Sequence, residues 1–344
     1  MKKCAVLAAV ILCAAAAVPA CAEEPNLKTV KGVLEYVAQN QPAELDLGEV
    51  RMKPAELLAI KAAMGENAVL HFTITWLGVR VSDTDTLLDM SKANGRPSVE
   101  DIGMMVQLLP DLQRVDLSKG FRLSSKNMIT LIETYPDIQF DWLIILNEGH
   151  SLYSYDTAYS TFNDPQQNPV KLYSNQLDIL KYAPGLKALD LGHNNLTSLD
   201  FLQYFPDLEF LILGDNLMID DISMIGTLKH LKFLELFSVG VTDISPLANC
   251  TELIDLNLSY DTKLTDLSVL DGLTNLERFW GSHMTGMSEE AQAAFIAAHP
   301  DTEVKFNASH ATSDGWRQHE RYTHYIWCLK HHTWIPFDEP LPDQ

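Results

Sequence analysis

The sequence predicts an α/β solenoid in which short strands from successive repeats form one parallel sheet along a concave face. The first observation is a repeat: from residue 186 the chain reads LKALDLGHNNLTSLDFLQYFPD, LEFLILGDNLMIDDISMIGTLKH, LKFLELFSVGVTDISPLANCTE and LIDLNLSYDTKLTDLSVLDGLTN. Each unit has 22 or 23 residues and begins with LxxLxL. The second observation is alternation, because neighbouring side chains of a strand point to opposite faces and the two leucines of LxL therefore face inward together. One such unit cannot bury its apolar face alone, so stacked neighbours must supply the core.

Stacking is expected to align these leucines in two inward columns. The columns consist of Leu189, Leu191, Leu211, Leu213, Leu234, Leu236, Leu256 and Leu258. The segments DFL, DISMI, DISPL and DLSVL carry the apolar residues that would fill the convex side.

The pattern over residues 186 to 275 resembles bacterial leucine-rich repeats, and the short unit with its segment TDISPLANC is similar to the internalin subgroup. As a whole, the layout resembles leucine-rich repeat proteins exported by gut-dwelling Firmicutes. The resemblance implies tight convex turns rather than long helices. It also implies a buried Asn at the ninth position of each unit, whose amide bonds neighbouring loops. Asn194 and Asn216 fit, whereas Val239, Asp261 and Met284 stand at the later positions and predict an irregular ladder.

The earlier part of the chain carries a longer and looser repeat. Residues 43 to 90 can be aligned with residues 113 to 161, each as a strand, an amphipathic helix and two strands around a turn. The predicted turns lie at Leu77 with Gly78 and at Glu148 with Gly149, and the predicted helices span Ala55 to Ala63, Lys126 to Thr134 and Val99 to Leu108. Residues 288 to 306 repeat the helix-bearing pattern.

Four regions are therefore expected. They are a signal peptide at 1–22, helix and hairpin repeats at 23–170, the repeat array with its closing helix-bearing repeat at 171–306, and an aromatic and His-rich C-terminal cap at 307–344.

The first residues, MKKCAVLAAVILCAAAAVPACAEEP, combine two lysines, an apolar run and small residues before an acidic segment. This pattern is typical of a signal peptide cleaved before Glu23 and predicts an extracellular or cell-surface protein. A second interpretation remains open, in which residues 18 to 21 form a lipobox and a lipidated Cys21 anchors the chain. No later apolar run is long enough to span a membrane.

Charge and cysteine content restrict the partners and the chemistry. The chain carries 46 acidic and 25 basic residues, a net charge of -21, which disfavours nucleic acid and anionic membranes as partners. Cys250 stands where a repeat carries a buried leucine, so we interpret it as a small buried hydrophobe. A disulfide bridge from Cys250 to Cys328 is the alternative.

Asp190 lies three residues before His193 and suggests an acid–base pair, but the repeat register explains the spacing. Both are concave positions, and their counterparts in the later units are Ile212 and Asp215, then Glu235 and Ser238. The dyad does not recur, and no nucleophile or phosphate loop accompanies it. We therefore predict no catalytic residues and no cofactor.

The concave positions instead carry aromatic and charged side chains that the solenoid core does not need. An uncovered apolar patch usually marks a partner site, so we predict a protein or peptide ligand on this face. The candidate residues are Asp190, His193, Phe210, Ile212, Phe233, Glu235, Phe237, Asp255, Tyr260, Arg278 and Trp280. Two alternatives remain: the N-terminal hairpins or the tail could cover the stripe, or Tyr260 and Trp280 could stack on a cell-envelope glycan.

The last 38 residues, 307–344, contain five of the eleven histidines. His319 and His324 are five residues apart and no acidic residue completes a recognised ligand motif, so we predict no metal site. The aromatic residues of this segment are expected to lie on the last repeat and cover the edge of the sheet.

Overall fold

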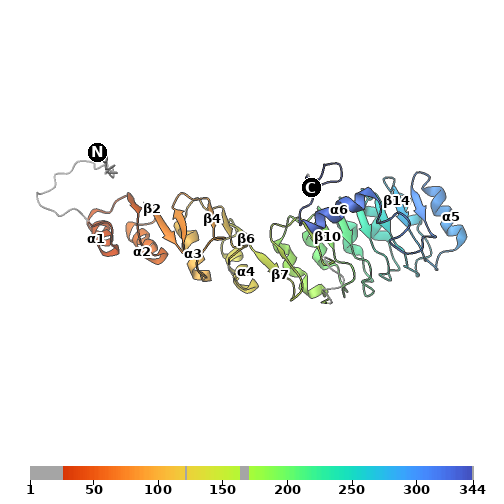
Figure 1. The fold of residues 1–344 in the computed structure, drawn as a ribbon, viewed down its shortest axis with the longest axis horizontal. Helices are drawn as coiled ribbons and strands as arrows, with labels where there is room; N and C mark the ends of the chain where they lie inside the picture. Colours follow the sequence, from red (N-terminus) through yellow and green to blue (C-terminus); the bar gives the residue numbers. More distant parts are fainter. Residues whose placement is uncertain (1–25, 121, 163–169, 343–344) are drawn as a thin grey trace, which may run out of the picture. The chain divides into compact units, whose positions relative to one another are not determined.

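The structure is a computed structural model that describes residues 26–120, 122–162 and 170–342, and it divides into two compact units (Figure 1). Unit 1 comprises the described residues up to Trp76 together with Arg80–Asp85 and Asp101–Asp111. Unit 2 holds Leu77–Val79, Thr86–Glu100 and the remainder from Leu112. In the described ranges, no helix is both long and apolar enough to cross a membrane.

Unit 1 contains a short sheet in the order β1-β2-β3 with three helices. Strands β1 and β2 run parallel, and β2 turns into β3 at Leu77 and Gly78, which both have positive φ. The predicted turn is therefore present, with glycine at a left-handed position. The elements are α1 (Val30–Asn40), β1 (Glu44–Glu49), α2 (Pro54–Met64), β2 (Val69–Trp76), β3 (Val79–Ser82) and α3 (Val99–Leu108). The sequence did not predict α1.

The first part of unit 2 contains a parallel sheet in the order β4-β5-β6 and the antiparallel hairpin β7-β8. Helix α4 begins after Ser124, whose hydroxyl accepts the Asn127 N–H and satisfies one donor of the first turn. The elements are β4 (Leu87–Asp89), β5 (Arg114–Asp116), α4 (Ser125–Thr134), β6 (Gln139–Asp141), β7 (Leu143–Ile145) and β8 (Ser151–Tyr153).

The repeat array forms a seven-stranded parallel sheet in the order β15 to β9, which confirms the α/β leucine-rich repeat solenoid (Figure 1). Its strands are β9 (Ala158–Ser160), β10 (Ala188–Asp190), β11 (Phe210–Ile212), β12 (Phe233–Glu235), β13 (Asp255–Asn257), β14 (Arg278–Trp280) and β15 (Glu303–Lys305), and α5 (Glu289–Ala298) precedes the last. Leu189 pairs with Leu211, Leu211 with Leu234 and Leu234 with Leu256, all fully buried. The inward columns are therefore as predicted.

Short 3-10 helices occupy the convex side, because a unit of 22 or 23 residues leaves little room for a longer helix between its strands. They are η1 (Ser174–Gln176), η2 (Asp178–Tyr182), η3 (Asp200–Tyr204), η4 (Ser223–Thr227), η5 (Ser245–Asn249) and η6 (Ser268–Leu270).

Buried amides join neighbouring units, as the family resemblance implied. The Asn194 amide accepts the Leu172 N–H at 2.8 Å, and the Asn216 amide accepts the Leu196 N–H at 3.1 Å. Asp261 continues the accepting half of this pattern, because its Oδ1 accepts the backbone N–H groups of residues 239 and 240 at 3.1 Å each. Its Oδ2 is buried without a hydrogen-bond partner. The bonding between neighbouring loops is thus preserved in the fourth unit, where a buried carboxyl takes the place of the amide.

The residue two positions after the LxL segment takes a left-handed conformation in five consecutive units. We call this row the loop ladder: His193, Asp215, Ser238, Tyr260 and His283, with φ between 56° and 65°. This region is sparsely occupied by residues other than glycine. Here it is held by backbone bonds, since each N–H of the first four donates to a carbonyl of the next unit at 2.8 to 3.0 Å. The side chains therefore project at a regular spacing along one edge of the sheet.

The tail, residues 307–342, folds back along the concave face. Its helix α6 (Glu320–Lys330) lies against β9 and β10, at the other end of the sheet from β15. Trp316 packs on Phe233 and Trp280 with ring centroids 5.4 and 5.2 Å apart. The sequence predicted that the tail aromatics lie on the last repeat, and this is corrected: they extend along the concave face of the array.

Candidate functional site

The concave side chains of β10 to β14 are buried beneath the tail. We call them the strand rows: Ala188, Asp190, Phe210, Ile212, Phe233, Glu235, Asp255, Asn257, Arg278 and Trp280, none more than 6% exposed. The tail side chains Trp316, Tyr325, Cys328 and Leu329 belong to the same buried cluster. The expectation that these side chains form an open stripe is therefore wrong. The sequence left the N-terminal hairpins and the tail as possible covers, and it is the tail that covers them.

Two carboxylates of the strand rows, those of Glu235 and Asp255, are neutralised by the tail. Asp255 accepts two hydrogen bonds from Arg321, at 2.9 and 3.0 Å, and one from Arg278 at 3.2 Å. Glu235 accepts from the Trp316 indole N–H and, at 2.8 Å, from Arg317. A buried carboxylate is tolerated only when it is paired and hydrogen-bonded. These two carboxylates therefore fix the tail in register on the sheet.

Arg317 lies at the boundary between the covered rows and the surface. Burial acts to lower the pKa of its guanidinium, but the charge of Glu235 and the hydrogen bond to it more than offset this, so the pKa is raised. The guanidinium carbon is also 5.2 Å from the ring centre of Tyr322. Arg317 thus remains cationic, with its charge balanced by a carboxylate beneath it.

A groove remains open between the loop ladder and the tail. It consists of two pockets, of about 270 and 310 Å³, which share His193 and Arg317. We call them together the ladder groove. The first pocket is lined by Ser160, Phe162, Asp190, His193, Ile212, Arg317, Tyr322, Ile326, Leu329 and Lys330. The second is lined by His193, Asp215, Phe237, Ser238, Tyr260, His310, Ala311, Thr312 and Arg317.

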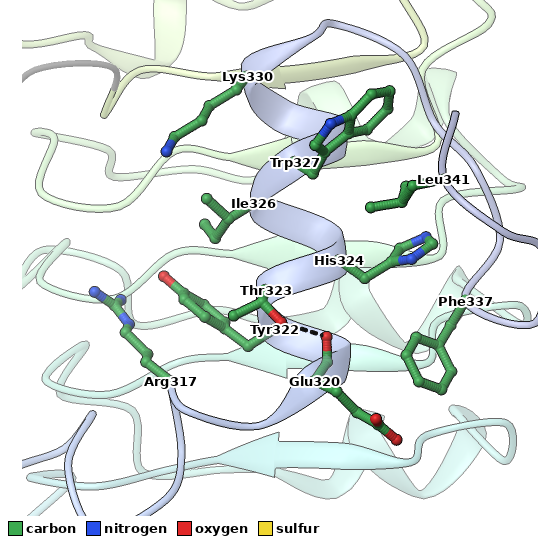
Figure 2. A pocket seen from close by; sticks show the side chains of 10 residues that line it. All are labelled: Arg317, Glu320, Tyr322, Thr323, His324, Ile326, Trp327, Lys330, Phe337 and Leu341. Carbon is green, nitrogen blue, oxygen red and sulfur yellow. Dashed lines mark hydrogen bonds between the residues drawn. The ribbon is translucent and has the colours of Figure 1, made fainter. Parts of the chain in front are cut away.

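Helix α6 contributes one side of its surface to the first pocket. Arg317, Tyr322, Ile326 and Lys330 lie to one side of the helix axis, and Trp327, His324, Phe337 and Leu341 lie to the other (Figure 2). Both groups also line an outer hollow of about 590 Å³ to which the repeat array contributes no residue. The groove side of the tail therefore carries an apolar centre between two cations, Arg317 before α6 and Lys330 at its end.

The ladder side of the groove is polar and partly accessible. His193 Nδ1 lies 2.9 Å from Asp215 Oδ2, and the two side chains are 39% and 37% exposed. The hydrogen bond from His193 lowers the pKa of Asp215. The His193 ring also stacks on Phe162 at 5.3 Å. Tyr260 stacks on His283 at 4.5 Å, which orders the far end of the groove.

The candidate residues predicted from the sequence thus fall into two groups. Asp190, His193, Ile212, Phe237 and Tyr260 line the ladder groove. The remainder line neither pocket and lie beneath the tail: Phe210, Phe233, Glu235, Asp255, Arg278 and Trp280. Contact between these six and a partner would require displacement of the tail.

Sequence reasoning missed the residues that complete the groove from outside the repeats, among them Ser160, Arg317, Tyr322 and Lys330. A signal for the tail residues was present. Acidic residues stand at concave positions of several strands, and the tail carries Arg317, Arg321 and Lys330. Opposite charges on two segments that both need cover predict that they pair.

The two tail histidines considered as metal ligands have local structural partners. His319 caps α6 by accepting the Arg321 N–H at 3.2 Å, and His324 Nε2 lies 2.8 Å from the Ile335 carbonyl. In the described part of the chain, no three His, Cys, Asp or Glu side chains are grouped as metal ligands. Cys250 and Cys328 are both free and buried, so the alternative of a disulfide bridge between them is wrong.

Comparison with known proteins adds the following. No family model matches the chain, and no match is found among curated proteins. Internalin C2 from Listeria monocytogenes is similar over 46% of this chain and 76% of its own, at 20% identity and a TM-score of 0.31. Internalin F from the same organism is similar over 86% of this chain and 87% of its own, at 14% identity and a TM-score of 0.35. A leucine-rich repeat protein of Leptospira interrogans is similar over 76% of this chain and 71% of its own, at 15% identity and a TM-score of 0.28. These TM-scores are too low to carry an argument, so the assignment of the fold rests on the repeats and the sheet described above.

Proposed function

We propose that the chain is an exported, non-catalytic binding module that recognises a peptide or a segment of a protein in the ladder groove. The observation that carries the proposal is the groove itself, a concave strip with apolar walls and a few polar groups, which is the usual composition of a recognition site. Export is proposed on the signal-peptide pattern alone, since residues 1–22 and Cys21 lie outside the described residues.

The shape of the groove favours an extended segment as the ligand. The two pockets meet at His193 and Arg317 and follow the loop ladder past several strands. Strands in a sheet are about 4.8 Å apart, so an extended chain that lies along the groove would pass several ladder side chains. Accessible aromatic and arginine side chains at such positions are frequent anchors of interfaces.

A glycan ligand has less support, because the tryptophan of the aromatic pair predicted for it is not accessible. Trp280 is fully buried, and its indole N–H donates to the Ser313 carbonyl at 3.1 Å. Tyr260 is already stacked on His283. Trp280 therefore offers no face on which a sugar could stack, which leaves only the partly exposed Tyr260 of the predicted pair.

The test is a selection of binding peptides from a random library displayed against the full chain, followed by affinity measurements on substituted chains. We expect His193→Ala and Tyr260→Ala each to weaken the selected peptides by about tenfold or more, equivalent to about 1.4 kcal/mol. Unfolding curves should show that both variants remain folded, because both side chains are partly exposed.

Two matched controls separate the groove from the rest of the array. His230 also pairs with an acidic residue, Glu252, at 3.2 Å, and precedes β12 at the opposite edge of the sheet. Tyr204 is a half-buried tyrosine on the convex 3-10 helix η3. His230→Ala and Tyr204→Ala should leave the affinity unchanged. If the controls lose affinity while the groove variants retain it, or if no peptide is selected, the proposal is wrong.

A further inference from the structure

The first pocket of the ladder groove is more enclosed than the second and has more apolar walls. Ile212 and Leu329 are each only 2% exposed and close its apolar side together with Ile326. Its volume of about 270 Å³ lies just below the range of pockets that hold drug-sized ligands. The cavity therefore suits one large apolar side chain rather than a long ligand.

A hydrogen-bond acceptor lies against one wall of this pocket. Asp190 accepts the Ser160 hydroxyl at 2.8 Å and the Gly192 N–H at 3.1 Å. A carboxylate has about four acceptor positions, so these two bonds leave capacity on both oxygens. Burial raises the pKa of Asp190, which means that the charged form is incompletely stabilised. An N–H donor from a ligand would supply the missing stabilisation.

A cation without a partner lies at the rim. Lys330 is exposed, and within the described ranges its ammonium group has no acidic partner. Arg317, the other cation of the pocket, is already paired with Glu235 at 2.8 Å. The charge available to an incoming ligand is therefore that of Lys330, which favours an anionic group at the mouth.

We infer that this pocket binds the C-terminal residue of a peptide with an apolar last side chain, an inference that rests on the proposed function of the ladder groove. Such a residue carries in one unit an apolar side chain, a backbone N–H and a carboxylate. The side chain would lie among Ile212, Ile326 and Leu329, the N–H would donate to Asp190 and the carboxylate would face Lys330. A free apolar amino acid carries the same groups and is the second possible source of this chemistry.

The experiment titrates the full chain by calorimetry with acetyl-Gly-Gly-Leu as the probe. The same tripeptide with a C-terminal amide keeps the side chain and the N–H but lacks the negative charge. We expect the acid to bind at least about tenfold more tightly than the amide, and acetyl-Gly-Gly-Asp to bind more weakly than either. Equal affinities of acid and amide would overturn the assignment of the carboxylate to Lys330. Free leucine is titrated in parallel, and binding as tight as that of the acid tripeptide would identify the free amino acid as the source.

Two variants and one control locate the site. Lys330→Met should abolish the preference for the acid over the amide, whereas Lys126→Met, an exposed lysine on α4 that lines none of the pockets described here, should retain it. Ile326→Trp should block all three tripeptides and free leucine by filling the pocket, with the fold checked by circular dichroism. Retention of the acid preference in Lys330→Met would overturn the inference.

Failure of this inference differs from failure of the proposed function. If library-selected peptides bind and respond to His193→Ala and Tyr260→Ala, but no C-terminal tripeptide binds, the inference is wrong and the groove remains a binding site for internal segments. If the selected peptides themselves do not depend on His193 and Tyr260, the proposed function is wrong as well.

Discussion

The strand rows and the loop ladder belong to the same repeats. In each repeat a strand-row residue precedes the ladder residue by three positions, as Glu235 precedes Ser238 and Trp280 precedes His283. Side chains of both rows point away from the leucine core. The strand rows nevertheless lie beneath the tail and are almost fully buried, whereas much of the ladder stays accessible at the edge of the sheet. Repeat register therefore predicts which side chains the solenoid does not need for its own core. It does not predict which of them another segment covers.

The contrast is largest for the aromatic side chains, and one pair of substitutions tests it. Phe233 is fully buried and stacks on Phe210 at 4.6 Å. We expect Phe233→Ala to lower the free energy of unfolding by about 4 kcal/mol, since it removes apolar contacts and leaves a cavity. Tyr260→Ala should lower it by about 1 kcal/mol or less. Denaturant unfolding of both variants measures the difference.

A similar loss in the two variants would contradict the comparison. If Phe233→Ala unfolds as the unsubstituted chain does, the tail does not pack on the strand rows in solution. In that case, the concave face would be open and the original candidate residues would again form the site.

Ion pairs give the second test, with a smaller effect. Arg321 is 9% exposed at its side chain and pairs with Asp255, which is 1% exposed. Arg321→Met should cost about 3 kcal/mol, because it leaves a buried carboxylate with only Arg278 as partner. Asp215→Asn breaks the half-exposed pair with His193 and should cost about 0.5 kcal/mol. Comparable costs, measured by thermal and denaturant unfolding, would mean that the tail pairs are as solvated as the ladder pair.

Much of the fold, but only part of the site, could be predicted from the sequence. The leucine columns, the tight convex turns and the helix Val99–Leu108 follow from local periodicity and repeat length, which a single chain displays directly. The position of the tail depends on contacts such as that between Arg317 and Glu235, which are 82 residues apart. Long-range pairing of this kind leaves no periodic signal. Complementary charges indicate that the tail pairs with the sheet but do not give its register, so Lys330 and Tyr322 could not be assigned to the groove before the tail was placed.

Asp261 gives the third and smallest test, since it lies directly beneath the accessible ladder, next to Tyr260. Burial raises the pKa of Asp261 to about 7, although the hydrogen bonds from the N–H groups of residues 239 and 240 act to lower it. The folded-state pKa is thus above the unfolded value of about 3.8, so between these pH values the folded state binds more protons. Stability must therefore fall as pH rises through this window and remain at its lower level above pH of about 7.

Asp261→Asn restores the residue type found at Asn194 and Asn216 and removes this titration. We expect it to raise the free energy of unfolding by about 2 kcal/mol at pH about 8 and by less at pH about 5, because at the lower pH the native carboxyl is largely protonated. Unfolding curves of both chains at the two pH values test this, since titrations elsewhere cancel in the difference. A gain independent of pH would mean that the carboxyl is solvated and that accessibility at the ladder extends one residue deeper than the structure places it.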